Sequence, residues 1–161
     1  MKPNNPIYAL YKRDTLVDKD KLFDQYNCPS EGSFIGWKVA MVFRNESCEF
    51  CIIKLKIPAV SQRLRAFESR KCRCEFAEVA DIQLFFGGAS LPDDTVAYSM
   101  YEMTNFDYPS LRYRTKYKKG EVIFPDGWDA DRTIECGHGI HFFMNREDAI
   151  SFVISFVTLQ R

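Results

Sequence analysis

The sequence predicts a single α+β domain built on a strongly bent, mainly antiparallel sheet, continuous or split, with two or three helices. Two apolar runs, residues 33–43 and 51–57, flank the polar residues 44–47, which is the pattern of a β-hairpin. Residues 111–118 alternate between cationic side chains and apolar or hydroxyl-bearing ones, which is the period of a strand. Residues 135–152 combine a glycine-punctuated turn, a short apolar run and a helix start, and we expect the rest of the chain to pack around them.

Length and composition limit the class of protein. A chain of 161 residues that is 46% hydrophobic can bury one core, so we expect one α+β domain over residues 7–161. Residues 1–6 contain Pro3 and Pro6 and are expected to form a flexible arm. The 22 basic and 22 acidic residues balance, so no global charge favours nucleic acid or a membrane. No apolar run approaches the roughly 20 residues of a membrane span, which predicts a cytoplasmic protein without a membrane partner.

The remaining elements follow from local patterns. The C-terminal helix is expected to begin after Asn145, with Glu147 and Asp148 in its first turn, where acidic side chains favour the positive helix end. A turn at Lys119-Gly120 is expected to join the alternating strand to residues 121–124 as its antiparallel partner. Further predicted elements are a strand at residues 7–12, a short helix ending at Tyr26, one long strand over residues 72–86 and a strand at residues 140–143.

The six cysteines are predicted to be free thiols. They occupy positions 28, 48, 51, 72, 74 and 136. Disulfides suit small secreted chains with poor cores, which this chain is not. The pairs Cys48-x-x-Cys51 and Cys72-x-Cys74 raise the alternative of a zinc site, but both pairs fall on predicted strands and lack the turns of a zinc knuckle. We therefore expect no metal.

No catalytic motif is complete. The two histidines, His138 and His141, stand outside any metal-binding motif, and the chain contains neither a P-loop nor a dinucleotide-binding glycine pattern. Cys136 lies two residues from His138, but nucleophile and base pairs usually come from distant segments. His141 alternates with Ile140 and Phe142, so it projects from the opposite face of its strand and faces either a cleft or a structural partner. The sequence favours a chain without catalytic residues or a cofactor.

Cationic side chains give the better prediction of a site. Residues 63–73 hold five basic residues in eleven positions, and two predicted strands each carry a cationic face. If these strands are neighbours, their arginines and lysines would suit phosphate groups, and nearby tyrosines would suit bases. The alternative is a solvated polar face paired with the acidic residues. The candidate ligand-binding residues are Lys54, Lys56, Arg63, Arg65, Lys71, Arg73, Arg112, Arg114, Lys116 and His141.

Two segments resemble an uncharacterised domain family of large DNA viruses, phages and bacteria, found alone or attached to ankyrin or pentapeptide repeats. The first is Ile52-Ile53-Lys54-Leu55-Lys56-Ile57-Pro58-Ala59, followed by Arg63 and by residues 70–79. The second is Tyr117-Lys118-Lys119-Gly120-Glu121-Val122 together with residues 135–143. The resemblance covers residues 33–153 and implies a viral or bacterial setting, with no established activity.

A second resemblance is to ADP-ribosyltransferases and related NAD-binding folds. Gly137-His138-Gly139-Ile140-His141-Phe142-Phe143 and the helix after it look like the Gly-x-Gly-Ile-Tyr-Phe strand and helix of that class. His141 replaces the stacking tyrosine, and Lys12-Arg13-Asp14 replaces the His-Gly-Thr type of motif. The resemblance implies a split sheet with a nucleotide-sized cleft.

Three functions stay open. The first hypothesis is a non-catalytic module that binds a phosphorylated, nucleotide-like ligand, as a viral or phage protein intercepting a host signalling nucleotide would. The second is an adaptor domain that contacts a host protein through Tyr98, Tyr101, Phe106 and Tyr108. The third is a divergent ADP-ribosyltransferase-like enzyme that uses Cys136, His138 or His141.

Overall fold

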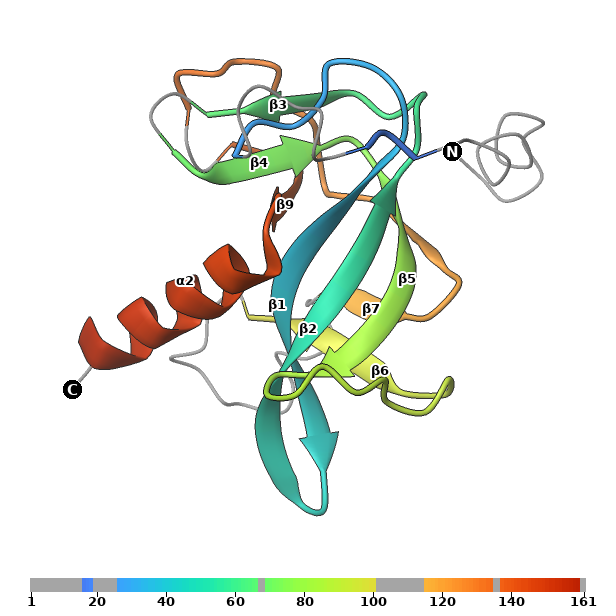
Figure 1. Ribbon diagram of the computed structural model, residues 1–161, viewed down its shortest axis with the longest axis vertical. Coiled ribbons are helices and arrows are strands. Elements are labelled where there is room, and N and C mark those ends of the chain that lie inside the picture. Colours follow the sequence, from blue (N-terminus) through green and yellow to red (C-terminus); the bar gives the residue numbers. More distant parts are fainter. Residues whose placement is uncertain (1–15, 19–25, 67–68, 101–114, 135–136, 160–161) are drawn as a thin grey trace.

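A computed structural model describes residues 16–18, 26–66, 69–100, 115–134 and 137–159. Within these ranges the chain forms one open, antiparallel sheet of nine strands and one helix. The sheet is strongly curled, so that β6 and β7 lie behind β2 and β5 (Figure 1). The curl creates an inner face, which is filled by the main core, and an outer face, on which the helix packs.

The centre of the sheet is the hairpin of β1 (Phe34–Arg44) and β2 (Ser47–Ile57), which confirms the predicted hairpin. The two strands pair along their whole length, from Phe34 opposite Ile57 to Arg44 opposite Ser47. Asn45 and Glu46 form the turn with φ angles of 49° and 64°. Positive φ at both central turn residues gives the twist that suits a two-residue hairpin.

Four further strands extend this hairpin. β5 (Ala77–Leu84) pairs with β2, and β8 (Val122–Ile123) pairs with β5. On the other edge β6 (Val96–Ser99) pairs with residues 40–42 of β1, and β7 (Lys116–Lys118) pairs with β6. Two strands are therefore added at each edge of the central hairpin in this part of the sheet.

A smaller arm of the sheet leaves β1 at a single position. β9 (Ile140–Phe143) joins β1 through one register pair, Trp37 opposite Phe143. β4 (Lys71–Cys74) pairs with all of β9, and β3 (Arg63–Arg65) pairs with β4. This arm of β3, β4 and β9 crosses the top of the central strands (Figure 1).

Helix α2 (Arg146–Leu159) follows β9 after two residues. The Asn145 amide donates to the Asp148 carboxylate (3.1 Å), and Glu147 joins Asp148 in the acidic first turn, as predicted. Arg146 holds the helix start against β5 by donating to the side chain of Gln83 (3.1 Å) and the carbonyl of Leu84 (2.9 Å). The helix packs on the outer face, where Ala149 and Val153 contact Val39, Ile52 and Phe85 in a second core cluster.

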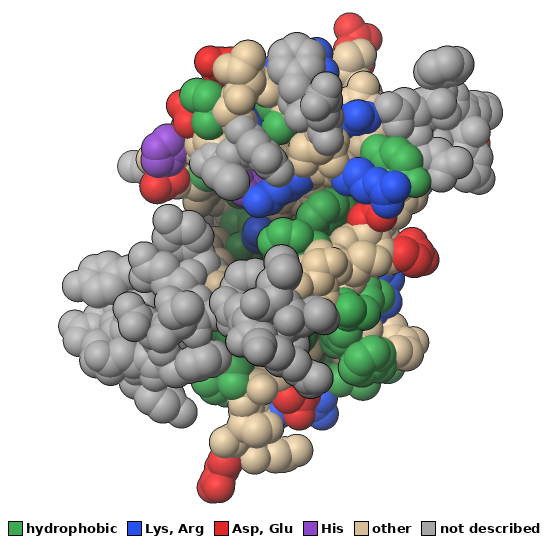
Figure 2. All heavy atoms as spheres, turned by 90° about the vertical axis from the view of Figure 1, so that its left-hand side faces the viewer, with side chains coloured by type: hydrophobic (Ala, Val, Ile, Leu, Met, Phe, Trp, Pro, Cys, Tyr) green, Lys and Arg blue, Asp and Glu red, His purple; other side chains and the backbone are tan. Residues whose placement is uncertain are grey.

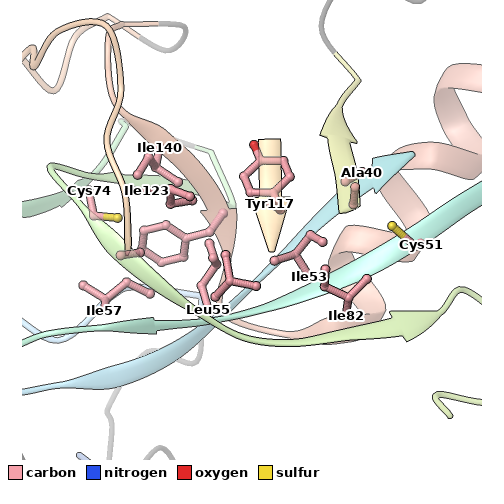
Figure 3. Packing of buried hydrophobic residues seen from close by; sticks show 14 of the residues in the cluster. Ala40, Cys51, Ile53, Leu55, Ile57, Cys74, Ile82, Tyr117, Ile123 and Ile140 are labelled. Atoms are coloured by element: carbon pink, nitrogen blue, oxygen red, sulfur yellow. The ribbon is translucent and has the colours of Figure 1, made fainter. Parts of the chain in front are cut away.

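The main core fills the inside of the curl. Leu55 and Ile57 of β2 are fully buried, and they face Tyr117 of β7 and Ile140 of β9 across this space. Figure 3 shows that side chains from β2, β7, β8 and β9 point toward one another there. Burial raises the pKa of Tyr117 above its usual range, so its hydroxyl stays neutral. The described helix is too short and too polar to cross a membrane.

The predicted α+β class with two or three helices is wrong. The described part of the chain is mostly antiparallel sheet with the single helix α2, because its apolar residues follow strand periodicity almost throughout. The predicted arm at residues 1–6 and strand at residues 7–12 lie outside the described residues, as does most of the short helix predicted before Tyr26.

One predicted strand and one predicted strand pairing are also corrected. Residues 72–86 were expected to form one strand, but the chain turns at Glu75 and Phe76 and gives β4 and β5. The turn is fixed because the Phe76 amide donates to the buried Ser61 hydroxyl at 3.0 Å. β8 does not pair with β7 across Gly120; it pairs with β5, since the Gly120 amide and the Glu121 carbonyl bond to Val79 instead.

Candidate functional site

Three basic residues of adjacent strands lie near the junction of the arm and the central hairpin and influence one another's charge. Lys71 of β4 and His141 of β9 lie on one face of the arm, as their registers with Phe143 and Arg73 show. Lys38 of β1 follows directly after Trp37, which pairs with Phe143, so alternation along the strand turns its side chain toward the other face of the sheet. Figure 2 shows this side of the molecule, with a hollow at which Lys and Arg side chains and hydrophobic side chains gather.

The charges of these groups act on one another. Burial, together with the positive charge of Lys71, lowers the pKa of Lys38 from its usual value of 10.5 to about 8. Burial likewise lowers the pKa of His141 to about 4, with added repulsion from Lys71, Lys38 and Arg73. At neutral pH His141 is therefore neutral, while Lys38 remains mostly protonated at an energetic cost.

No carboxylate forms an ion pair with Lys38, Lys71 or His141 in the described part of the chain. The Nε2–H of neutral His141 donates to the Gly137 carbonyl at 2.8 Å, since a carbonyl can only accept. Within the described ranges no residue bonds to the other ring nitrogen, Nδ1. The cluster is positive, partly dehydrated and uncompensated, which favours an incoming anion.

Aromatic rings border the cluster. The Lys71 ammonium lies 5.5 Å from the centroid of the Phe152 ring, and Phe152 packs against Phe143 with centroids 5.7 Å apart. Phe152 of α2 keeps 42% of its surface exposed. A ligand held by Lys71 would therefore find an apolar surface beside its charged group.

Arg63 and Arg73, two of the predicted site residues, are structural. Arg73 is 1% exposed, and its guanidinium donates to the carbonyls of Asp129, Asp131 and Ile134, which fastens residues 129–134 to β4. Arg63 stacks over the Phe34 ring at 5.1 Å and is likewise saturated by backbone carbonyls. Its five acceptors, at 2.6–3.3 Å, belong to Pro29, Gly32, Pro58, Ala59 and Ser61.

The cationic face of β2 also lies on the outer face of the sheet, where Lys54 stands in the same row as Lys71 but is separated from it by Trp37 and Phe143. Lys54 stands opposite Asp81 and Lys56 opposite Glu78 in the pairing with β5, so acidic residues flank both. The Lys54 ammonium lies 5.9 Å from the centroid of the Trp37 ring. Lys54 and Trp37 line an apolar cavity of about 290 Å³ with Val17 among its walls. These lysines do not join Lys71 and His141.

The other predicted site residues are dispersed. Lys116 is exposed on β7, which pairs with β6 farther along the edge of β1 that β9 also joins. Arg65 lies on β3, the outermost strand of the arm. Arg112 and Arg114 lie outside the described residues. Of the ten predicted residues, the structure thus brings together Lys71, His141 and, as a structural element beneath them, Arg73.

Lys38 was missed by the sequence analysis. It interrupts the apolar run of residues 33–43 as its only charged residue. A lone charge in a strand buried on both faces is costly, and such a position is retained where the charge has a partner or a use. The single lysine within this apolar run was the feature of the sequence that could have predicted Lys38 as a site residue.

The two histidines proposed for catalysis bond to different partners. His138 is exposed and its Nδ1 lies 3.0 Å from the Asp126 carboxylate, which raises the pKa of the imidazole. His141 is bonded to a backbone carbonyl, and Cys136 lies outside the described residues. The described cysteines are free, as predicted, and no group of metal-ligating side chains occurs in the described ranges.

The fold and site define a mostly-β domain, a curled antiparallel sheet with a basic cluster where its arm meets the central hairpin. The chain belongs to the family of unknown function DUF5758, whose model matches residues 24–149. This agrees with the predicted resemblance to an uncharacterised domain family. No curated protein and no solved structure matches the chain.

Proposed function

We propose that this domain is a non-catalytic binding module for a phosphorylated, nucleotide-like ligand, which it holds at Lys38, Lys71 and His141. The observation that supports the proposal is the gathering of three basic groups without an ion-paired carboxylate among the described residues. Unpaired buried charge is expensive, so a fold that keeps it gains most when an anion enters.

A phosphate group suits the chemistry of this cluster. The positive charge of Lys71 lowers the pKa of Lys38, so the two ammonium groups share one electrostatic environment and both would attract an anion that enters it. Each ammonium supplies donors to phosphate oxygens, and the anion raises the pKa of His141 so that Nδ1 can also donate. The exposed ring of Phe152 beside Lys71 offers a surface on which a base can stack.

Thermal-shift and calorimetric titrations with nucleoside monophosphates, diphosphates and cyclic nucleotides test this function. A compound that binds the native state raises the melting temperature, by an amount equivalent to about 2.7 kcal/mol at one hundred times its Kd. The affinity should fall at least about tenfold in Lys71→Met and in Lys38→Met, because each loses a charge-assisted hydrogen bond.

Lys116→Met is the matched control, since it removes one exposed lysine from the same sheet without touching the cluster. It should leave the affinity unchanged. Absence of any shift with all phosphorylated compounds at millimolar concentration, or an equal loss in the control, would overturn the proposal.

The setting that the resemblance implies, large DNA viruses, phages and bacteria, suits a module that removes a signalling nucleotide from a host. Cyclic nucleotides in the same titrations test this finer proposal, and binding of ordinary mononucleotides with equal affinity would count against it. The rival adaptor function rests on aromatic residues of which Tyr98 is described, packed edge-on against Phe43 at 5.9 Å.

A further inference from the structure

Two buried thiols from distant parts of the chain meet in the main core. Cys28 lies in the segment that leads into β1, and Cys72 lies on β4 with its side chain on the inner face. They are 8% and 1% exposed. The Cys72 sulfur contacts the carbonyl of Tyr26, two residues before Cys28, at 3.6 Å. Cys28 and Cys72 belong to the same buried cluster and each shifts the pKa of the other, which indicates that the two thiols are neighbours.

The surroundings assign different roles to the two thiols. The hydrogen bond from Cys72 lowers the pKa of Cys28, and the positive charges of Arg63 and Arg132 lower it further. The same hydrogen bond and burial raise the pKa of Cys72. Arg63 is held in place because its guanidinium donates to the carbonyl of Pro29, directly after Cys28. Cys28 is thus the better nucleophile, and Cys72 remains a thiol.

We propose that Cys28 and Cys72 form a reversible disulfide when the protein meets a peroxide. The Cys28 thiolate attacks one peroxide oxygen, the O–O bond breaks, and hydroxide leaves, so that the sulfur is oxidised to a sulfenic acid. The Cys72 sulfur then attacks the Cys28 sulfur, the S–O bond breaks, and the Cys72 proton leaves with that oxygen as water. A dithiol reductant reverses the reaction.

The other described thiols are placed differently. Burial raises the pKa of Cys51 to about 12 and raises that of Cys74 as well, so neither forms the thiolate readily. Cys48 is exposed and its sulfur contacts the Met41 sulfur at 3.7 Å, outside the cluster that holds Cys28 and Cys72, so it reports oxidation at the surface. A specific link between Cys28 and Cys72 is therefore expected against a background of unlinked cysteines.

Peptide mapping of the whole protein tests this inference. The folded chain is treated with hydrogen peroxide, alkylated in denaturant and digested without reduction. We expect a cross-linked peptide pair containing Cys28 and Cys72, which disappears after reduction, while Cys51 and Cys74 are recovered alkylated. The oxidised protein should unfold at a higher temperature, because the link constrains the unfolded chain.

Cys72→Ser removes the thiol that forms the disulfide, so the reaction should stop at the sulfenic acid on Cys28. A dimedone reagent should trap that sulfenic acid in this variant. Cys48→Ser is the matched control and should form the cross-link as the natural chain does. Recovery of Cys28 and Cys72 fully alkylated, under peroxide that has already oxidised Cys48, would overturn the inference, as would pairing of Cys28 with any other cysteine.

Discussion

Arg73 and His141 stand directly opposite each other on β4 and β9, and their side chains share one face of the arm. The Arg73 guanidinium donates to the carbonyls of Asp129, Asp131 and Ile134, whereas the His141 ring bonds through Nε2 to the Gly137 carbonyl and no described residue bonds to its Nδ1. One basic residue of the pair thus fastens residues 129–134 to β4, and the other keeps a nitrogen that no described residue engages. This division leads to the first prediction.

Arg73→Met should lower the free energy of unfolding by about 3–5 kcal/mol. The substitution leaves the carbonyls of Asp129, Asp131 and Ile134 without their buried donor, and unsatisfied buried polar groups are costly. Urea denaturation followed by circular dichroism measures the loss.

Arg70→Met provides the comparison for Arg73. Arg70 is largely exposed and pairs with Asp148 at 2.9 Å, so its removal should cost no more than about 1 kcal/mol. Equal losses in the two variants would contradict the structural role of Arg73.

Lys38→Met should stabilise the protein by about 1–3 kcal/mol at neutral pH. The folded pKa of Lys38, about 8, lies below its usual value of 10.5, so the folded state bears the cost of a dehydrated ammonium. Natural protein should recover this stability as pH rises from 8 to 10.5, because there the unfolded chain keeps a proton that the folded chain has released. The difference between variant and natural protein should shrink over that range, and a variant less stable at neutral pH would refute the prediction.

His141 should make the fold sensitive to acid. Its folded pKa of about 4 lies below the usual 6.5, so the unfolded state binds the proton first and stability falls as pH drops from 6.5 to 4. The loss should reach about 3 kcal/mol. His141→Gln keeps a donor for the Gly137 carbonyl and should remove this dependence, as urea titrations at several pH values would show.

His138 serves as the control with the opposite sign. Its hydrogen bond to Asp126 raises its pKa, so any stability it adds is present at low pH and is lost as pH rises through its folded pKa. His138→Gln should therefore retain the loss of stability between pH 6.5 and 4. Disappearance of that loss in His138→Gln would assign the wrong histidine.

Gly36→Ala should destabilise the junction of β1 and β9. A Cβ at Gly36 would lie 2.5 Å from a ring carbon of Phe142 and 3.0 Å from the Ile57 side chain, both fully buried. Overpacking of this kind costs about 1–3 kcal/mol. Gly87→Ala meets no atom within 4 Å and tests the strain of positive φ alone. A cost no larger at Gly36 than at Gly87 would show that the junction is loosely packed.

The parts of the fold that the sequence predicts well are those with local instructions. The hairpin of β1 and β2 follows from two apolar runs and a polar turn, and β9 with α2 follows from an apolar run and the acidic residues after Asn145. The prediction that His141 projects from the other face of its strand than Ile140 and Phe142 is confirmed, because Ile140 and Phe142 are buried and His141 is partly exposed. These features depend on residues within one turn or one strand.

The rest depends on contacts between distant residues. The break between β4 and β5 needs the Ser61 hydroxyl, and β8 pairs with β5 because Gly120 bonds to Val79. Neither contact is visible in a local pattern. For the site, cationic density pointed to Lys71, but only the register shows that His141 lies on the neighbouring strand and that Arg73 is consumed by backbone carbonyls. The pattern of charges along a sequence does not show which groups each charged side chain contacts in the folded protein.

The single register pair between Trp37 and Phe143 gives the sheet a mechanical weak point. Lys71 and His141 belong to the arm, and Lys38 belongs to the central hairpin. A rotation of the arm about the Trp37–Phe143 pair would therefore change the distance between these basic groups. We expect an anion that bridges the two parts to act as a brace, slowing amide hydrogen exchange in β9 more than in β2. Binding of an anion would then be detected as slower opening of the contact between β1 and β9.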